Sequence, residues 1–351
     1  MPRRRLDPAI FHLPVDRMRA GYYSDKYFVR AREVLRADDH HPRVLMQVFG
    51  KAHAYLGGVD EAIAILKLCA ESWSDLAVHA LYDGDEVRPW ETVMTIEGPY
   101  DAFAPLETLY LGVLARRTRV GTNTRRVVDA ARPREVMFFP ARHDHWLVQT
   151  GDGYAAHIAG AIGVSTDAQA SWWGSEGVGT VPHAIIGAYG GDTVRATERF
   201  AAHVPPDVRL ISLVDWDNDC VTTSLAVARA LGERLYGVRL DTSETMVDAS
   251  VIPQMGAFKP TGVNPRLVGN VRTALDGEGF HHVKIIVSGG FDVEKIRRFE
   301  EERVPVDAYG VGSSLFGGRY DFTADVVRVD GRPCAKMGRS YRPNPRLERV
   351  T

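Results

Sequence analysis

The order of apolar and polar residues changes character partway along the chain. Up to about residue 130, short apolar runs such as 44–49 mix with helical stretches such as 57–73 and 104–131. Beyond that point, apolar runs rich in β-branched residues alternate with helical stretches. The first part predicts a small α+β domain over residues 1–130. The second part predicts an α/β domain over residues 131–318.

Seven apolar runs in the second part predict strands that are buried on both faces, as in a parallel sheet. They cover residues 135–139, 160–165, 177–184, 209–216, 234–242, 283–290 and 307–314. So many strands in so short a stretch favour a compact or incomplete barrel, with an open doubly wound sheet as the alternative. In the tail, residues 319–351, the sequence predicts one or two strands, after which the apolar residues show no regular spacing. This tail could pack against the first domain.

Composition narrows the class of protein. The chain has 351 residues, of which 45% are hydrophobic, and a net charge of −2. This balance gives no support for a nucleic-acid or membrane partner. The three cysteines, Cys69, Cys220 and Cys334, have no metal-ligand spacing and indicate no disulfide framework. No apolar run is long enough to span a membrane. We expect a cytoplasmic protein.

Polar and ionisable residues follow most of the predicted strands. In a parallel barrel, functional groups gather at the carboxyl ends of the strands. In chain order these ends carry Phe139, Arg142 and His143; His183; Asp215, Asp217 and Asp219; Arg239 and Asp241; Gly289 and Gly290; and Gly310 and Gly312.

The two glycine clusters follow neighbouring predicted strands and predict a phosphate site. Glycine lets backbone N–H groups approach an anion, and a helix N-terminus adds a favourable dipole. In "SGGFDVEKI" the glycines precede a helix that Asp292 opens. Loops after the last two strands of such barrels often bind phosphate. The alternative is that these glycines only form tight turns.

The acidic residues allow two interpretations. Asp215 in "VDWDNDC" would suit a metal ion or a ribose hydroxyl. The alternative is that this segment is a polar turn, in which Asp219 or Asn218 caps the next helix. Arg239 and Asp241 lie two residues apart on a strand and so face the same way. They could bind a phosphate and a ribose, or form an internal salt bridge.

The remaining candidates are weak when taken singly. His183 is a lone histidine, and such residues are most often structural. Phe139 and Arg142 would suit a flat, anionic ring, or they are a core aromatic beside a surface arginine. Tyr27 lies in "YYSDKYF", which by itself predicts the start of an amphipathic helix with packed tyrosines.

Taken together, "YYSDKYF", "SGGFDVEKI" and "VDAYGVGSSLF" resemble nicotinate phosphoribosyltransferase. This enzyme belongs to the type II phosphoribosyltransferase group with the quinolinate and nicotinamide enzymes. The resemblance implies an α/β fold with an N-terminal α/β sandwich domain and an irregular seven-stranded TIM-like α/β barrel. It also implies that residues 319–351 pack back on the first domain, and that the protein is a homodimer with shared active sites.

The resemblance also implies roles for the ring-binding residues. Phe139 and a Tyr27 from the partner subunit match the two aromatics that sandwich the pyridine ring. Arg142 resembles the family arginine beside that ring, where it would attract a carboxylate. Pro140 is a departure, because family members often have glycine there.

Further implied roles concern the phosphoribosyl group and ATP. His183 matches the histidine that becomes phosphorylated when ATP hydrolysis is coupled to the reaction. Asp215 matches the acidic residue after the next strand, and Arg239 with Asp241 matches the site at the ring end and the ribose. Gly289, Gly290, Gly310 and Gly312 match the loops that hold the 5-phosphate.

The expected reaction transfers phosphoribose from phosphoribosyl pyrophosphate to nicotinate in NAD biosynthesis. Mg²⁺ would accompany the pyrophosphate near Asp215, and ATP would be a co-substrate. We expect no structural metal, because only Cys334 lies near the end of the chain. The alternatives are a quinolinate or nicotinamide acceptor, and a non-catalytic nucleotide-binding paralogue. A barrel isomerase or aldolase would need a catalytic lysine or glutamate, for which Lys259 is the nearest candidate.

Overall fold

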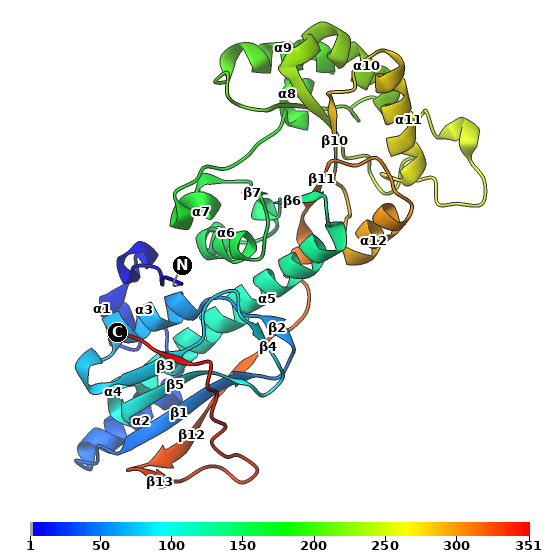
Figure 1. Cartoon of the computed structure of the whole chain (residues 1–351). Helices are drawn as coiled ribbons and strands as arrows, with labels where there is room; N and C mark the ends of the chain where they lie inside the picture. Colours follow the sequence, from blue (N-terminus) through cyan, green and yellow to red (C-terminus); the bar gives the residue numbers. More distant parts are fainter. Residues whose placement is uncertain (1–2) are drawn as a thin grey trace. The chain divides into compact units, whose positions relative to one another are not determined.

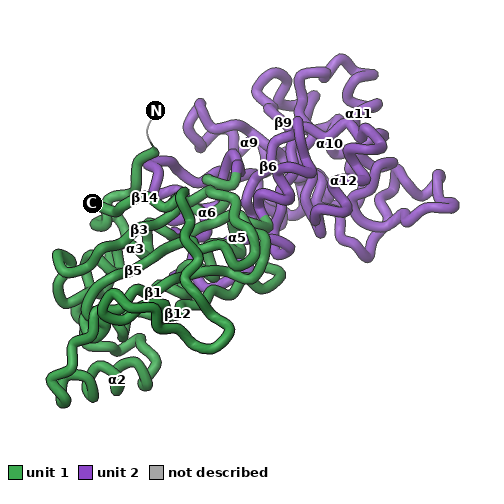
Figure 2. The backbone as a smooth tube through the Cα atoms, turned by 60° about the horizontal axis from the view of Figure 1, so that its bottom comes forward, with its two compact units in different colours: residues 1–123, 154–159, 316–351 green, residues 124–153, 160–315 purple. Residues whose placement is uncertain are grey.

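The structure is a computed structural model that describes residues 3–351. The chain forms two compact units (Figure 2). Of the described residues, the first unit contains 3–123, 154–159 and 316–351, and the second contains 124–153 and 160–315. The helices α5, Glu107–Ala131, and α6, Gln149–Ile158, each contribute residues to both units. The sequence predicts domain changes after residues 130 and 318.

The first unit joins the N-terminal part of the chain to its tail. Besides the first part of α5, its helices are α1 Val15–Arg19, α2 Lys26–Ala37, α3 Val59–Cys69 and α4 Tyr100–Phe103. Its strands are β1 Arg43–Gly50, β2 Ala54–Tyr55, β3 Ala77–Ala80, β4 Glu86–Val87, β5 Thr92–Pro99, β12 Phe322–Val329, β13 Arg332–Pro333 and β14 Glu348–Arg349. Figure 1 shows them along the chain.

An antiparallel sheet with the strand order β13-β12-β1-β5-β3-β14 forms the centre of the first unit. The tail strand β12 pairs with β1, for example through Val48 and Ala324. Almost every residue of β1 is buried, which shows that both faces of this strand are covered. Apolar residues of the sheet form one core with Ile63 and Leu66 of α3 and with Tyr110 of α5. Burial of this continuous apolar surface is the main force that stabilises the unit.

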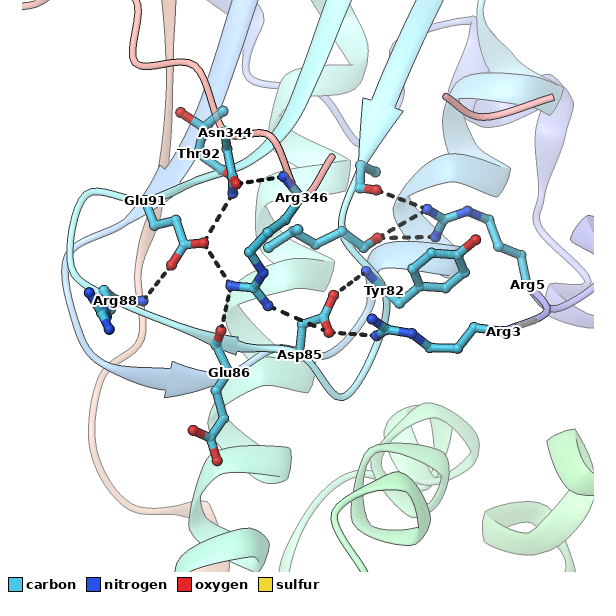
Figure 3. A network of polar contacts seen from close by, with 12 residues as sticks. Arg3, Arg5, Tyr82, Asp85, Glu86, Arg88, Glu91, Thr92, Asn344 and Arg346 are labelled. Atoms are coloured by element: carbon cyan, nitrogen blue, oxygen red, sulfur yellow. Dashed lines mark hydrogen bonds and ion pairs between the residues drawn. The ribbon is translucent and has the colours of Figure 1, made fainter. Parts of the chain in front are cut away.

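Ion pairs connect residues near both ends of the chain to the segment between β3 and β5 (Figure 3). Asp85, which is buried, binds the guanidinium groups of both Arg3 and Arg346. Its second carboxylate oxygen accepts a hydrogen bond from the N–H of Tyr82 at 2.9 Å. Arg346 also binds Glu91 at 2.7 Å. One buried carboxylate therefore holds segments from opposite ends of the sequence.

The second unit alternates strands with helices. Its strands are β6 Glu135–Phe138, β7 Gly163–Val164, β8 Leu210–Leu213, β9 Leu235–Leu240, β10 Lys284–Val287 and β11 Ala308–Val311. Besides the first part of α6, its helices are α7 Asp167–Ala170, α8 His183–Ala188, α9 Thr193–His203, α10 Cys220–Leu231, α11 Pro265–Gly277 and α12 Val293–Glu301.

These six strands form one parallel sheet in the order β7-β6-β11-β10-β9-β8. The sheet is curled, because Met137, Ile211, Ile286 and Ala308 from four different strands form one apolar cluster. Residues of β6 and β8 meet in this cluster although three strands, β11, β10 and β9, lie between them in the sheet order. The α/β prediction is confirmed, with a curled half-barrel in the second unit.

The predicted strand over residues 177–184 is wrong. This segment lies between the two edge strands but forms only one backbone hydrogen bond to each. The N–H of Val178 donates to Val164 at 2.7 Å, and that of Val181 donates to Ile211 at 3.0 Å. Gly177 and Gly179 weaken a strand, and Pro182 has no N–H for a ladder. The sheet therefore has six regular strands in the described part of the chain, with an irregular segment in the seventh position.

Within residues 3–351, none of the helices combines the length and the apolar character needed to cross a membrane.

Candidate active site

A cavity of about 1070 Å³ opens at the carboxyl ends of the parallel strands in the second unit. This is close to the upper limit, about 1,000 Å³, of the usual size range of small-molecule sites. Nine predicted site residues line it: Phe139, Arg142, His183, Arg239, Asp241, Gly289, Gly290, Gly310 and Gly312. Parallel strands all end on one edge of the sheet, so loops far apart in the sequence meet there.

His183 is the first residue of α8 and faces this cavity. Its Nε2 lies 3.1 Å from Oδ1 of Asp215, which follows β8. Asp215 is buried, with 7% of its side chain exposed, whereas 42% of the His183 side chain is exposed. A carboxylate only accepts hydrogen bonds, so Nε2 carries the hydrogen, and Nδ1 keeps its lone pair in the neutral ring.

Trp216 supports the helix that carries His183. The two ring centroids lie 6.4 Å apart. Gly187 and Gly191 leave room for the indole, because a Cβ at either position would lie 3.1 or 2.7 Å from it. The position of His183 therefore depends on close packing between α8 and the residue that follows Asp215.

Arg239 and Asp241 project from the end of β9 into the cavity, 3.5 Å apart. Arg239 donates to Oγ1 of Thr180 at 2.8 Å, and Asp241 accepts from Oγ of Ser288 at 2.7 Å. Burial lowers the pKa of Arg239, and Asp241 opposes this effect. An arginine still stays protonated at neutral pH. The internal salt bridge that the sequence left open is present, and both side chains also line the cavity; binding of a phosphate and a ribose stays a prediction.

The buried Nε of Arg239 has no hydrogen-bond partner among the described residues. A buried, unpaired N–H is costly, and here it belongs to a side chain that lines the cavity. The guanidinium carbon lies 5.9 Å from the centre of the Phe139 ring. Positive charge and an aromatic face therefore lie next to each other.

Phe139 rests against the backbone of β11. A Cβ at Gly310 would lie 2.6 Å from its ring, so only glycine leaves this space. Arg142 follows in a short 3₁₀ turn over Ala141–His143, and its charge contributes to the lowered pKa of Arg239. Pro140 precedes this turn without interrupting it. Phe139, Arg142 and Arg239 thus line the same cavity, with Arg239 next to the aromatic ring.

Gly289 and Gly290 turn the chain from β10 into α12. Their φ angles are 84° and 65°, in the left-handed region that favours glycine. Asp292 caps α12 by accepting from the N–H of Lys295 at 2.8 Å. The second glycine cluster, Gly310 and Gly312, leads into a 3₁₀ turn, Ser313–Phe316. Both loops line the same cavity, so the two clusters do converge.

The other predicted candidates lie elsewhere. Asp219 caps α10 through the N–H of Thr222, which confirms the capping interpretation for this residue. Asp217 is exposed and does not line the cavity. Tyr27 belongs to the first unit, where it is 62% exposed on α2 and donates to Asp25 at 3.3 Å. Burial raises its pKa, with Asp25 as a further cause.

The described residues include no cluster of three or more His, Cys, Asp or Glu side chains that could hold a metal ion. Asp215 directs one oxygen to His183 and lies outside the cavity lining. The donor set therefore does not fit a resident metal at Asp215, and Mg²⁺ would need oxygen ligands from the substrate.

Sequence reasoning missed four residues at this site: Thr180, Ser288, Glu244 and Lys295. Ser288 lines the cavity and directly precedes the first glycine cluster. Its position next to that cluster could have identified it. Thr180 and Glu244 matter through partners far away in the sequence, which no local pattern reveals. Lys295 contacts Gly289 in the loop just before its own helix, and only the direction of its side chain decides this contact.

Comparisons with known proteins agree with this geometry. Residues 25–118 match the family described as quinolinate phosphoribosyl transferase, N-terminal domain. The nicotinate phosphoribosyltransferase pncB1 of Mycobacterium tuberculosis is 30% identical over 276 residues, which are 75% of this chain and 56% of that protein. The chain thus spans about half the length of the curated relatives that it matches.

Solved structures extend the likeness to nearly the whole chain. The nicotinate-nucleotide pyrophosphorylase of Pyrococcus furiosus has 33% identity and a TM-score of 0.81, covering 96% of this chain and 85% of its own. Human nicotinic acid phosphoribosyltransferase shares the fold, with a TM-score of 0.67 at 17% identity over 89% and 75% of the two chains.

The second unit therefore combines a curled α/β half-barrel with one cavity that two glycine loops, Phe139, Arg142 and Arg239 line. The chain belongs to the type II phosphoribosyltransferase family. The resemblance noted in the sequence is confirmed at this level.

Proposed function

We propose that this protein transfers phosphoribose from phosphoribosyl pyrophosphate to nicotinate, giving nicotinate mononucleotide and pyrophosphate. The observation that carries this proposal is the single cavity in which Phe139, Arg142 and Arg239 lie beside both glycine loops. The names of the curated relatives support nicotinate as the acceptor.

In this proposal the ring end of the cavity selects an aromatic carboxylate. Phe139 offers a face for the pyridine ring, and Arg142 attracts its carboxylate. Tyr27 of the partner subunit would cover the opposite face of the ring in a homodimer. The guanidinium group of Arg239, which lines the cavity, would donate to the acceptor or to the sugar.

The sugar end holds the donor. Asp241, fixed by Ser288, would accept a hydrogen bond from a ribose hydroxyl, and the two glycine loops would bind the 5-phosphate. The bond between the anomeric carbon and the pyrophosphate oxygen breaks, and the leaving group takes the electron pair. The lone pair of the ring nitrogen then forms the new bond. No side-chain base is needed, so alignment supplies much of the acceleration.

Two co-reactants complete the proposal. Mg²⁺ would enter with the pyrophosphate and neutralise the leaving group, held chiefly by substrate oxygens. ATP would stimulate the reaction by phosphorylating His183, whose imidazole Asp215 orients. The setting would be NAD biosynthesis or salvage in the cytoplasm.

The test is incubation of the full chain with phosphoribosyl pyrophosphate, Mg²⁺ and an equal mixture of nicotinate, nicotinamide and quinolinate, with and without ATP. Mass spectrometry identifies the products. Nicotinate mononucleotide, increased by ATP, is the expected result. A product from another acceptor would overturn the nicotinate assignment, and no product from any acceptor would favour a non-catalytic nucleotide-binding protein.

A further inference from the structure

Lys295 lies in the first turn of α12 and reaches back over the first glycine loop. Its Nζ donates to the carbonyl oxygen of Gly289 at 3.0 Å and lies 4.2 Å from the centre of the Phe291 ring. Its own N–H is engaged by the cap, Asp292. Burial lowers the pKa of Lys295, so this ammonium has lost much of its water and depends on these contacts.

This contact fixes the orientation of one peptide group. In a trans peptide the C=O and the following N–H point in opposite directions. When Lys295 holds the carbonyl of Gly289, the N–H of Gly290 must therefore point away from Lys295. Among the hydrogen bonds of residues 3–351, none uses the N–H of Gly289 or Gly290 as donor. Both residues line the cavity, so these donors are available to a ligand.

A carboxylate lies on the other side of the same loop. A Cβ at Gly290 would lie 2.0 Å from Oε1 of Glu244, so this oxygen sits directly against the glycine. Glu244 also lines the cavity and opposes the lowering of the Lys295 pKa. The first glycine loop thus lies between two charges. The ammonium of Lys295 holds its backbone, and the carboxylate of Glu244 lies where a ligand anion would bind.

We propose that Lys295 is a positioning residue that presents the Gly290 N–H to a phosphate group, and that Glu244 opposes this phosphate by like charge. The proposal rests on the proposed function in one respect, that the first glycine loop binds the 5-phosphate of the donor. It adds two residues that set the strength of this binding. Neither acts on the reacting atoms.

The experiment compares Lys295→Met and Glu244→Gln with the unaltered protein, using ribose 5-phosphate as the probe. Dissociation constants come from calorimetry, and the Gly290 amide is followed by NMR in [¹⁵N]glycine-labelled protein. Lys295→Met should weaken binding about 10-fold or more, because a charge-assisted hydrogen bond no longer fixes the loop. Glu244→Gln should tighten binding about 3- to 10-fold at low salt.

Lys284→Met is the matched control. Lys284 begins the same strand, β10, and pairs with Asp307 at 3.1 Å, outside the candidate active site. The Lys284→Met variant should bind ribose 5-phosphate with the same affinity as the unaltered protein. Thermal unfolding shows whether each variant is folded. If Lys295→Met does not fold, Glu244→Gln still decides, because its predicted effect is a gain.

The outcomes separate this proposal from the transferase assignment. If either Lys295→Met or Glu244→Gln leaves the affinity for ribose 5-phosphate unchanged, the proposal about these two residues is overturned. If ribose 5-phosphate shifts the Gly290 amide and both variants behave as expected, it stands even when no acceptor is converted. A protein that does not bind ribose 5-phosphate at this loop would refute both the proposal and the phosphate site. With active protein, Lys295→Met should raise the KM for the donor more than it lowers kcat.

Discussion

Nε2 of His183 and Oδ1 of Asp215 lie 3.1 Å apart, although 32 residues separate them in the sequence. The imidazole faces the cavity, and the carboxylate is buried behind it. This is the arrangement expected when a carboxylate orients a histidine that reacts with a ligand.

Replacement of Asp215 by Asn should reduce the stimulation by ATP while leaving basal transfer. The amide can keep a hydrogen bond but not the charge that stabilises a modified imidazole, so we expect a loss of about 10- to 100-fold in the ATP-dependent part. His183→Ala should abolish that part altogether. Initial rates with and without ATP measure both effects, and unchanged ATP stimulation in His183→Ala would exclude this role.

Arg239→Lys should raise the KM for the acceptor about 10- to 100-fold. Lysine cannot donate to Thr180 and keep a second donor directed into the cavity, as the guanidinium does. Thr180→Val should have a smaller effect in the same direction, about 5-fold. Arg234→Lys is the control, because Arg234 binds the carbonyl of Val208 instead. Equal KM values for Arg239→Lys and its control would contradict the assignment.

Gly310→Ala should displace the ring of Phe139 and weaken acceptor binding. The added Cβ would lie 2.6 Å from the ring, well inside van der Waals contact. We expect a loss of stability of about 1–3 kcal/mol together with a higher KM for the acceptor. Gly269→Ala is the control, because nothing lies within 4 Å of its Cβ on α11. That change should stabilise the protein by up to about 1 kcal/mol. Chemical unfolding and steady-state kinetics would show whether the two glycines differ in this way.

Glu107→Gln should make the protein more stable above neutral pH. Burial, with further repulsion from Asp325 and Asp25, raises the pKa of Glu107 to about 7. When the pKa of a carboxyl group is higher in the folded state than in the unfolded state, the protein loses stability as the pH rises from the unfolded-state pKa to the folded-state pKa. The penalty is absent below about pH 4.5 and complete above about pH 7.

The difference in unfolding free energy between Glu107→Gln and the unaltered protein should therefore grow by about 2–3 kcal/mol from pH 4.5 to pH 8. Denaturant unfolding at several pH values measures it. Glu97→Gln, an exposed glutamate on β5, serves as the control and should show no such trend. A difference that does not vary with pH would show that Glu107 ionises normally.

Asp85→Ala should lower the unfolding free energy by about 2–4 kcal/mol. It leaves Arg3, Arg346 and the N–H of Tyr82 without their shared buried acceptor. Glu86→Ala removes the neighbouring exposed carboxylate, while Arg346 binds only the backbone oxygen of Glu86, so this change should be nearly neutral. Similar losses in the two variants would argue against the shared anchor at Asp85.

Local patterns in the sequence predicted much of this protein. The apolar runs at 135–139 and 283–290 became β6 and β10, and the helical stretch 57–73 contains α3. Such runs are reliable because burial on both faces requires continuous apolar sequence. The glycine-rich ends of β10 and β11 likewise marked the loops that line the cavity. Gly289 and Gly290 allow a left-handed turn there, and Gly310 leaves space for the ring of Phe139.

The segment 177–184 shows the limit of local patterns. It has the apolar content of a strand, yet only two of its N–H groups find partners on the neighbouring edge strands. Strand formation is decided by the hydrogen bonds that neighbours can offer, and that information lies in other parts of the chain.

The sequence by itself determined the α/β class, most of the helices and strands, and the residue types at the ends of the parallel strands. Only the tertiary structure decided that Asp215 supports His183, that Thr180 holds Arg239, and that Glu244 lies against Gly290. The physical reason is that propensity and burial act on neighbouring residues, whereas these contacts join separate loops that meet only when the sheet has curled and brought its strand ends together.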